Sequence, residues 1–126
     1  MIVDLPPGTS DAPLTVMQVL NLDGFVVVTS PQALSKLDAK RSINMIRKLK
    51  INVFGIVENF SGNIFGSGAG ETLSEEMDLP FIGKIDMRPE YLDLTEPAVV
   101  SNPLISAEYE SICSSLNEIV AKFSSS

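Results

Sequence analysis

The chain has 126 residues, of which 44% are hydrophobic and 20% charged, enough for one globular domain with a single core. No apolar run approaches the ~20 residues of a membrane-spanning helix, and the formal net charge of −7 argues against general nucleic-acid binding. The absence of histidine excludes imidazole chemistry, and the single cysteine excludes an internal disulfide or a multi-cysteine metal site within one chain.

The first element is an apolar run, IVDL (residues 2–5), which we expect to form a short buried strand. It carries a carboxylate, Asp4, and leads at once into a turn through Pro6, Pro7 and Gly8. No basic segment followed by an apolar one is present at the N-terminus, so no signal peptide is visible and we expect a cytoplasmic protein. Residues 14–22 (LTVMQVLNL) are predicted to form a helix.

The middle of the chain alternates apolar runs with a helical pattern. Residues 25–29 (FVVVT) and 53–57 (VFGIV) are apolar without alternation, as in strands buried on both faces. Residues 32–50 between them have apolar side chains at helical spacing: Leu34, Leu37, Ile43, Ile46 and Leu49. The same segment holds six of the nine basic residues, Lys36, Lys40, Arg41, Arg47, Lys48 and Lys50, which form either a solvated helix face or a contact for an acidic partner or nucleic acid.

A glycine-rich segment, SGNIFGSGAGE (residues 61–71), does not match a Walker phosphate loop. Such a loop needs Gly-Lys-Ser/Thr after its glycines, whereas Gly70 is followed by Glu71, whose carboxylate would repel phosphate. We therefore interpret it as a flexible turn that leads into a short acidic helix over residues 71–78. Residues 81–85 (FIGKI) are predicted to form a last strand, and residues 86–102 to be irregular.

The final helix has the clearest pattern in the chain. Asn102 can cap it and Pro103 suits its first position. Its apolar residues step by four and three along one face, which predicts packing on a sheet: Ile105, Tyr109, Ile112, Leu116, Ile119 and Phe123. The lone Cys113 lies within this helix, and we expect a buried or half-buried structural thiol. The alternative is a cluster ligand shared across a dimer.

Apolar strands that alternate with helices indicate an α/β fold, a parallel sheet with helices on both faces. In such a sheet, ligands bind outside the carboxyl ends of the strands. Asp4 at the end of the first strand is therefore a candidate to hold Mg²⁺ through water, and Gly8 would let the backbone approach a phosphate. Asn59 follows strand 53–57 in the equivalent place and suits an adenine edge. The local alternatives are an Asp4 that caps a turn and an Asn59 that supports its own loop.

Several stretches resemble, in order, the Mrp-type (ApbC-like) ATPases of the MinD/ParA group of P-loop NTPases. They are IVDLPPGTSDAPLTVMQ, GFVVVTSPQALSKLDAKRSINMIRKL, VFGIVENFSG, IFGSGAGETLSEE and LPFIGKI. The resemblance runs from residue 2 to about residue 92, and the combination of DLPPGT, VVVTSPQ and GIVENF is specific to that family rather than to α/β folds in general.

The resemblance implies roles for the candidate residues. Asp4 would be the Walker B acid that binds the Mg²⁺–water shell, and Gly8 would approach the γ-phosphate within switch II. Asp11 lies in the same switch segment with no firm role, and Asn59 would read adenine. Family members bind and hydrolyse ATP as homodimers and are implicated in carrying iron–sulfur clusters to apo-proteins. We expect no nucleic-acid or membrane partner, because the balance is acidic and the last helix is not basic.

The sequence departs from the family pattern in two ways. The Walker A loop, with its lysines and Mg²⁺-binding hydroxyl, would lie upstream of the Walker B strand, but the given sequence begins with Met1 and Ile2 at the start of that strand. The Cys-x-x-Cys pair found in many members between the ENxS and IFG motifs is also absent, which excludes cluster binding by that route.

Residues 1–126 therefore resemble the C-terminal portion of one P-loop NTPase domain, a fold incomplete at the N-terminus, with Met1 an internal methionine or the start of a split gene product. We expect no ATPase activity from the chain alone. Two alternatives stay open: a fragment of a MinD/ParA-like positioning ATPase, and a non-catalytic interaction module that pairs with a separately encoded N-terminal half.

Overall fold

The computed structural model describes residues 2–5, 19–62, 66, 68–92, 95 and 97–124. Within these ranges it contains three strands, four α-helices and one 3₁₀-helix. In chain order they are β1 (Phe25–Thr29), α2 (Ala33–Lys48), β2 (Val53–Ser61), α3 (Ala69–Met77), β3 (Phe81–Asp86), η1 (Pro89–Leu92), α4 (Ala98–Ser101) and α5 (Pro103–Ser124). The helix predicted over residues 14–22 lies mostly outside the described residues.

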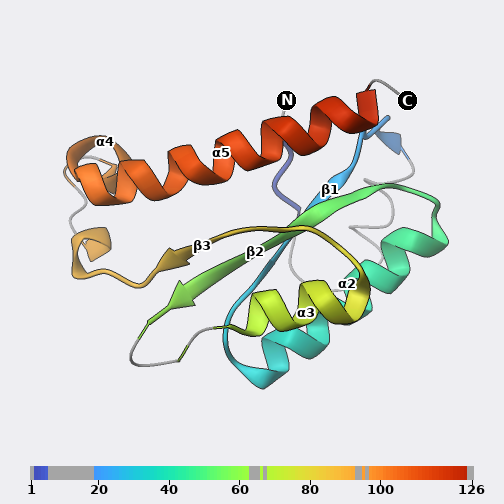
Figure 1. Ribbon diagram of the computed structural model, residues 1–126, viewed down its shortest axis with the longest axis horizontal. Coiled ribbons are helices and arrows are strands. Elements are labelled where there is room, and N and C mark those ends of the chain that lie inside the picture. Colours follow the sequence, from blue (N-terminus) through green and yellow to red (C-terminus); the bar gives the residue numbers. More distant parts are fainter. Residues whose placement is uncertain are drawn as a thin grey trace.

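The strands form a parallel sheet in the order β1-β2-β3, with Val27 of β1 opposite Ile56 of β2 and Val57 of β2 opposite Gly83 of β3. Figure 1 shows α5 lying across one face of this sheet and α2 and α3 on the other. The predicted α/β class, with helices on both faces, is confirmed. The segment expected to be irregular also contains the short helices η1 and α4.

The main core lies between the sheet and the pair α2 and α3. Its centre consists of fully buried branched side chains: Ile43 of α2, Ile56 of β2 and Leu73 of α3. The predicted apolar stripe of α2 is correct in its second half only, because Leu34 at the start of the helix is 77% exposed. The small side chain of Ala39 is buried instead, so α2 approaches the sheet through a short residue at that level.

The helix α5 begins and packs as the sequence predicts. Asn102 Oδ1 accepts hydrogen bonds from the backbone N–H groups of Leu104 (2.9 Å) and Ile105 (3.3 Å), which caps the helix. The helix packs on β3 and β2. A Cβ on Gly83 would lie 2.7 Å from Ile112 Cγ1, so glycine is what lets α5 approach β3 so closely.

Cys113 on α5 is exposed, so the expectation of a buried or half-buried thiol was wrong. It directly follows Ile112, which faces the sheet, and a step of one residue on a helix rotates a side chain by about 100°, away from that face.

Residues 2–5 do not form the predicted buried strand. They have no regular secondary structure, and Ile2 is 96% exposed, although Leu5 is partly buried against the core. A strand needs a neighbour to satisfy its backbone groups, and no described strand pairs with this segment. An apolar run alone is therefore insufficient here.

One side of β1 lacks cover. Val27 and Thr29 are buried, whereas Val28, which points to the opposite face by strand alternation, is 60% exposed. β1 is also an edge strand of the described sheet, since β2 is its only strand partner there. The face of β1 on the α5 side thus leaves apolar surface open to water. No helix in the described ranges is long and apolar enough to cross a membrane.

The basic segment of α2 is partly neutralised by α3. Lys36 Nζ lies 2.9 Å from Glu76 Oε1 and Lys40 Nζ lies 2.6 Å from Glu76 Oε2, while Arg47 donates a hydrogen bond to the carbonyl of Met77. Hydrogen bonds from Lys40 and then Lys36 lower the pKa of Glu76 to about 2. Three of the six basic residues thus hold the two helices together, which favours the structural interpretation of this segment.

Alanine substitutions should distinguish the buried half of the apolar stripe of α2 from its exposed half. We expect Ile43→Ala to lower the free energy of unfolding by about 2–5 kcal/mol, because Ile43 is fully buried. Leu34→Ala, the matched change on an exposed position, should stay within about 0.5 kcal/mol. Urea denaturation of both variants gives the values, and equal losses would contradict the placement of α2.

The ion pairs of Glu76 predict a pH dependence. Because the folded pKa of about 2 lies below the ordinary 4.5, the stabilisation is present above pH 4.5 and is lost as the pH falls towards 2. The melting temperature of the wild type should therefore exceed that of Glu76→Gln near pH 6, and the two should converge near pH 2. Glu75→Gln, on the same exposed helix surface, is the control. A constant difference down to pH 2 would count against the pairs.

Candidate functional site

The carboxyl ends of the three parallel strands meet at one edge of the sheet. Ser61 of β2 is opposite Asp86 of β3, and the backbone N–H of Met87 donates to the carbonyl of Ser61 at 2.8 Å. Helix α3 begins at the same edge, next to the end of β2. Of the predicted site residues in the described ranges, Asn59 lies here, near the end of β2.

Asn59 lies in a break of the β2–β3 ladder. The register shifts between Glu58 and Ser61, and Phe60 has a left-handed backbone with φ of 56°, which a bulky residue adopts only under constraint. Asn59 Oδ1 accepts a hydrogen bond from the Phe60 N–H at 2.9 Å. This is the kind of local hydrogen bond expected if Asn59 supports its own loop. The Asn59 Nδ2 donor has no partner within the described ranges, and its role towards adenine stays a prediction.

Asp4 is exposed and lies in the irregular segment 2–5. Gly8 and Asp11 fall outside the described residues. The proximity of Asp4, Gly8 and Asn59 therefore stays a prediction.

Within the described ranges no group of three or more carboxylate, thiol or imidazole side chains could hold a metal ion. Asp4 fits a Mg²⁺ site only as a single contributor, which is compatible with the habit of Mg²⁺ to keep several waters and bind one or two carboxylates beside phosphates.

A buried carboxylate, Glu58, is the polar residue at this edge that sequence reasoning missed. Only 1% of its surface is exposed. Its Oε1 accepts from the backbone N–H of Gly70 at 2.9 Å, and its Oε2 accepts from the hydroxyl of Ser61. Glu58 thus joins the end of β2 to the first turn of α3, where the helix dipole favours a negative charge.

A signal for Glu58 exists in the sequence. The apolar pattern predicts a strand that ends at residue 57, before the acid, whereas β2 spans Val53–Ser61. An acidic residue that continues an apolar strand, with a serine three positions later and glycines beyond, indicates a buried acceptor that needs local donors. The partner Gly70 was not predictable, because it depends on how α3 returns to the sheet.

The segment after β3 is fixed by a second charged cluster. Arg88 Nη2 lies 2.8 Å from Glu108 Oε1 on α5 and 3.6 Å from Asp86 Oδ2, and Glu108 Oε2 accepts from the Asp86 N–H at 3.0 Å. The hydrogen bond with Glu108 raises the pKa of Arg88. Glu108 therefore anchors the end of β3 to α5, on the opposite face from α3.

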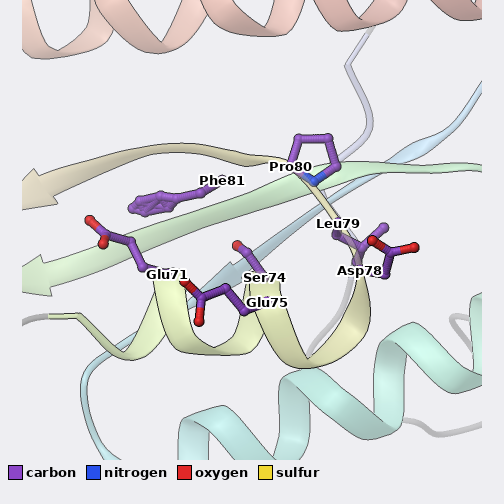
Figure 2. A pocket seen from close by; sticks show the side chains of 7 residues that line it. All are labelled: Glu71, Ser74, Glu75, Asp78, Leu79, Pro80 and Phe81. Carbon is purple, nitrogen blue, oxygen red and sulfur yellow. The ribbon is translucent and has the colours of Figure 1, made fainter.

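A groove of about 710 Å³ runs along α3 to the start of β3. Figure 2 shows Glu71, Ser74 and Glu75 of α3 on one side and Pro80 and Phe81 on the other. Neither Asp4 nor Asn59 lines this groove. It is a different feature from the carboxyl edge, and its acidic lining does not suit phosphate.

Comparison with known proteins identifies the family to which this chain belongs. The family model described as ParA, NUBPL iron-transfer P-loop NTPase, matches residues 1–123. The chain belongs to this family. It is 34% identical to the cytosolic Fe-S cluster assembly factor CFD1 of Saccharomyces cerevisiae, covering 97% of this chain and 47% of that protein. It is 39% identical to the iron-sulfur cluster carrier protein of Synechocystis, covering 98% of this chain and 39% of the relative.

The solved structures agree with the family assignment. A nucleotide-binding protein of Archaeoglobus fulgidus, determined in complex with ADP, is 37% identical with a TM-score of 0.60, over 70% of this chain and 40% of that one. The cell division ATPase MinD of Pyrococcus furiosus shares the fold, with 21% identity and a TM-score of 0.71 over 94% of this chain and 50% of that one. The predicted resemblance is confirmed, and the chain spans less than half the length of the two curated relatives.

The contact between Glu58 and α3 predicts an unusual effect of an alanine substitution. Alanine normally favours a helix over glycine by about 1 kcal/mol. A Cβ on Gly70, however, would lie 2.9 Å from Glu58 Cβ, so Gly70→Ala should destabilise the chain despite its helix propensity. Thr72→Ala, at an exposed position of the same helix, is the control. A Gly70→Ala variant with a raised melting temperature would contradict the contact.

Proposed function

We propose that the chain is the carboxyl-terminal portion of one P-loop NTPase domain, and that the complete domain binds ATP with Mg²⁺ in the assembly or transfer of iron–sulfur clusters. The observation that carries this proposal is the family match over residues 1–123, together with relatives named as cluster carriers and assembly factors. The chain by itself would contribute the base-binding edge of the nucleotide site rather than its phosphate-binding loop.

The uncovered side of β1 supports the idea of a missing portion. β1 has one strand partner within the described sheet, and Val28 is largely exposed. A neighbouring strand with its own covering helix would satisfy this edge and bury the apolar side chain. Without such a neighbour, the exposed edge of β1 should promote self-association of the chain.

The proposed roles follow the position of each residue. Asn59 would contact adenine from the carboxyl end of β2, Gly8 would approach the γ-phosphate, and Asp4 would hold the water shell of Mg²⁺. The phosphate-binding lysines would come from the missing portion, because the 126 residues contain no Gly-Lys-Ser/Thr segment. Without those lysines, nothing would neutralise the charge of the γ-phosphate, and phosphoryl transfer would not be catalysed.

The cluster would be cargo rather than a resident group, and this chain does not fit its binding by a cysteine pair. Cys113 is its single cysteine, and it lies on α5. We propose that the complete protein acts as a homodimer on apo-protein clients in the cytoplasm. The names of the yeast and cyanobacterial relatives support the client class, and the yeast name supports the location.

Reconstitution with a separately expressed N-terminal portion of the Synechocystis relative tests the proposal. The purified complex should bind a fluorescent ADP in the presence of Mg²⁺, and Asn59→Ala should weaken binding about 10-fold, as expected for the loss of one or two base hydrogen bonds. Asn44→Ala, on the exposed surface of α2, is the matched control and should bind as the wild type does.

The 126-residue chain alone should hydrolyse ATP no faster than background in the same buffer. Mg²⁺-dependent turnover by the pure chain would contradict the assignment of the phosphate site to a missing portion. A complex that fails to bind ADP would leave the interaction module as the better interpretation.

A further inference from the structure

Glu58 and Ser61 stand on either side of the ladder break that contains Asn59 and Phe60. Glu58 is the last regular position, opposite Thr29 of β1 and Lys84 of β3, and pairing resumes at Ser61 opposite Asp86. The hydrogen bond from the Ser61 hydroxyl to the Glu58 carboxylate therefore joins the two residues that flank the break. Breaks of this kind redirect the side chains that they contain.

The same carboxylate holds the break against the helix behind it. Glu58 Oε1 accepts the Gly70 N–H, and the Cα of Gly70 packs so closely that a Cβ would lie 2.9 Å from Glu58 Cβ. Both Glu58 and Ser61 are buried, so water does not compete for these bonds. Glu58 thus binds the first turn of α3 at Gly70 as well as Ser61 on the far side of the break.

We propose that Glu58 is a positioning residue that sets the orientation of Asn59 at the carboxyl edge, and so the placement of the adenine base. This inference rests on the proposed function. The chain of contacts runs from Gly70 through Glu58 and Ser61 to the strained Phe60, whose N–H in turn binds Asn59 Oδ1. That last bond turns the amide oxygen of Asn59 to the Phe60 N–H, which leaves Nδ2 to donate to a base.

The chemistry explains why a carboxylate suits this position. Both partners, the Ser61 hydroxyl and the Gly70 N–H, are donors, and a carboxylate offers two acceptor oxygens without a donor of its own. A glutamine keeps one acceptor for Gly70 and can donate to Ser61, whose hydroxyl also accepts. Glu58→Gln should therefore preserve the arrangement, whereas Ser61→Ala should release the break and keep the bond to α3.

Hydrogen exchange of the 126-residue chain, resolved to single residues by mass spectrometry, tests the geometry without any nucleotide. The Phe60 amide should exchange at least ~10-fold faster in Ser61→Ala, because its bond to Asn59 Oδ1 loosens, and the Gly70 amide should stay protected. Ser74→Ala removes another buried hydroxyl, one that donates to Gly70 O within α3, and should leave Phe60 unchanged. Glu58→Gln should lie within ~3-fold of the wild type.

The affinity of the reconstituted complex for ADP then separates positioning from mere structural support. Ser61→Ala should lower that affinity ~3- to 10-fold, with Glu58→Gln near the wild type and Ser74→Ala unchanged. Unchanged exchange of Phe60 in Ser61→Ala overturns the inference, as does faster exchange with unaltered ADP affinity. Failure of the proposed function has a different signature, since the wild-type complex itself would then not bind ADP.

Discussion

A parallel sheet is stable in water only where helices cover both of its faces, and this constraint governs the whole chain. β2 meets it from Val53 to Glu58, where every residue is buried between α5 and the pair α2 and α3. β1 meets it on one face only, so Val28 is exposed while Val27 is buried. In the order β1-β2-β3, the central strand β2 is therefore well covered, whereas the edge strand β1 needs a further element to cover it.

The burial of β2 from Val53 to Glu58 places a carboxylate inside the protein, near the carboxyl end of the strand. Glu58 is out of water, and burial of such a group is tolerated only where donors satisfy its oxygens. The donors come from two places, the strand itself at Ser61 and the start of α3 at Gly70. A polar contact therefore joins sheet to helix at the edge where ligands of open α/β sheets bind.

The family assignment and the length of the relatives fit this picture. A chain that spans less than half of its curated relatives carries a sheet with one unsatisfied side, and its family match runs through nearly all of it. The carboxyl edge of the described sheet carries Asn59, the ladder break around it, and the charged cluster of Arg88 and Glu108 that fixes the end of β3.

The sequence by itself determined the α/β class, the family, the strand β1 to the residue, and the cap and sheet-facing stripe of α5. These depend on local periodicity and capping, which neighbouring residues encode. Only the tertiary structure decided that residues 2–5 form no strand, that Leu34 and Cys113 face water, and that Glu58 binds Gly70. Each of these depends on a partner distant in sequence, because strand pairing, the cover of a face and the hydrogen bonding of a buried carboxyl group are set by which elements come together in space.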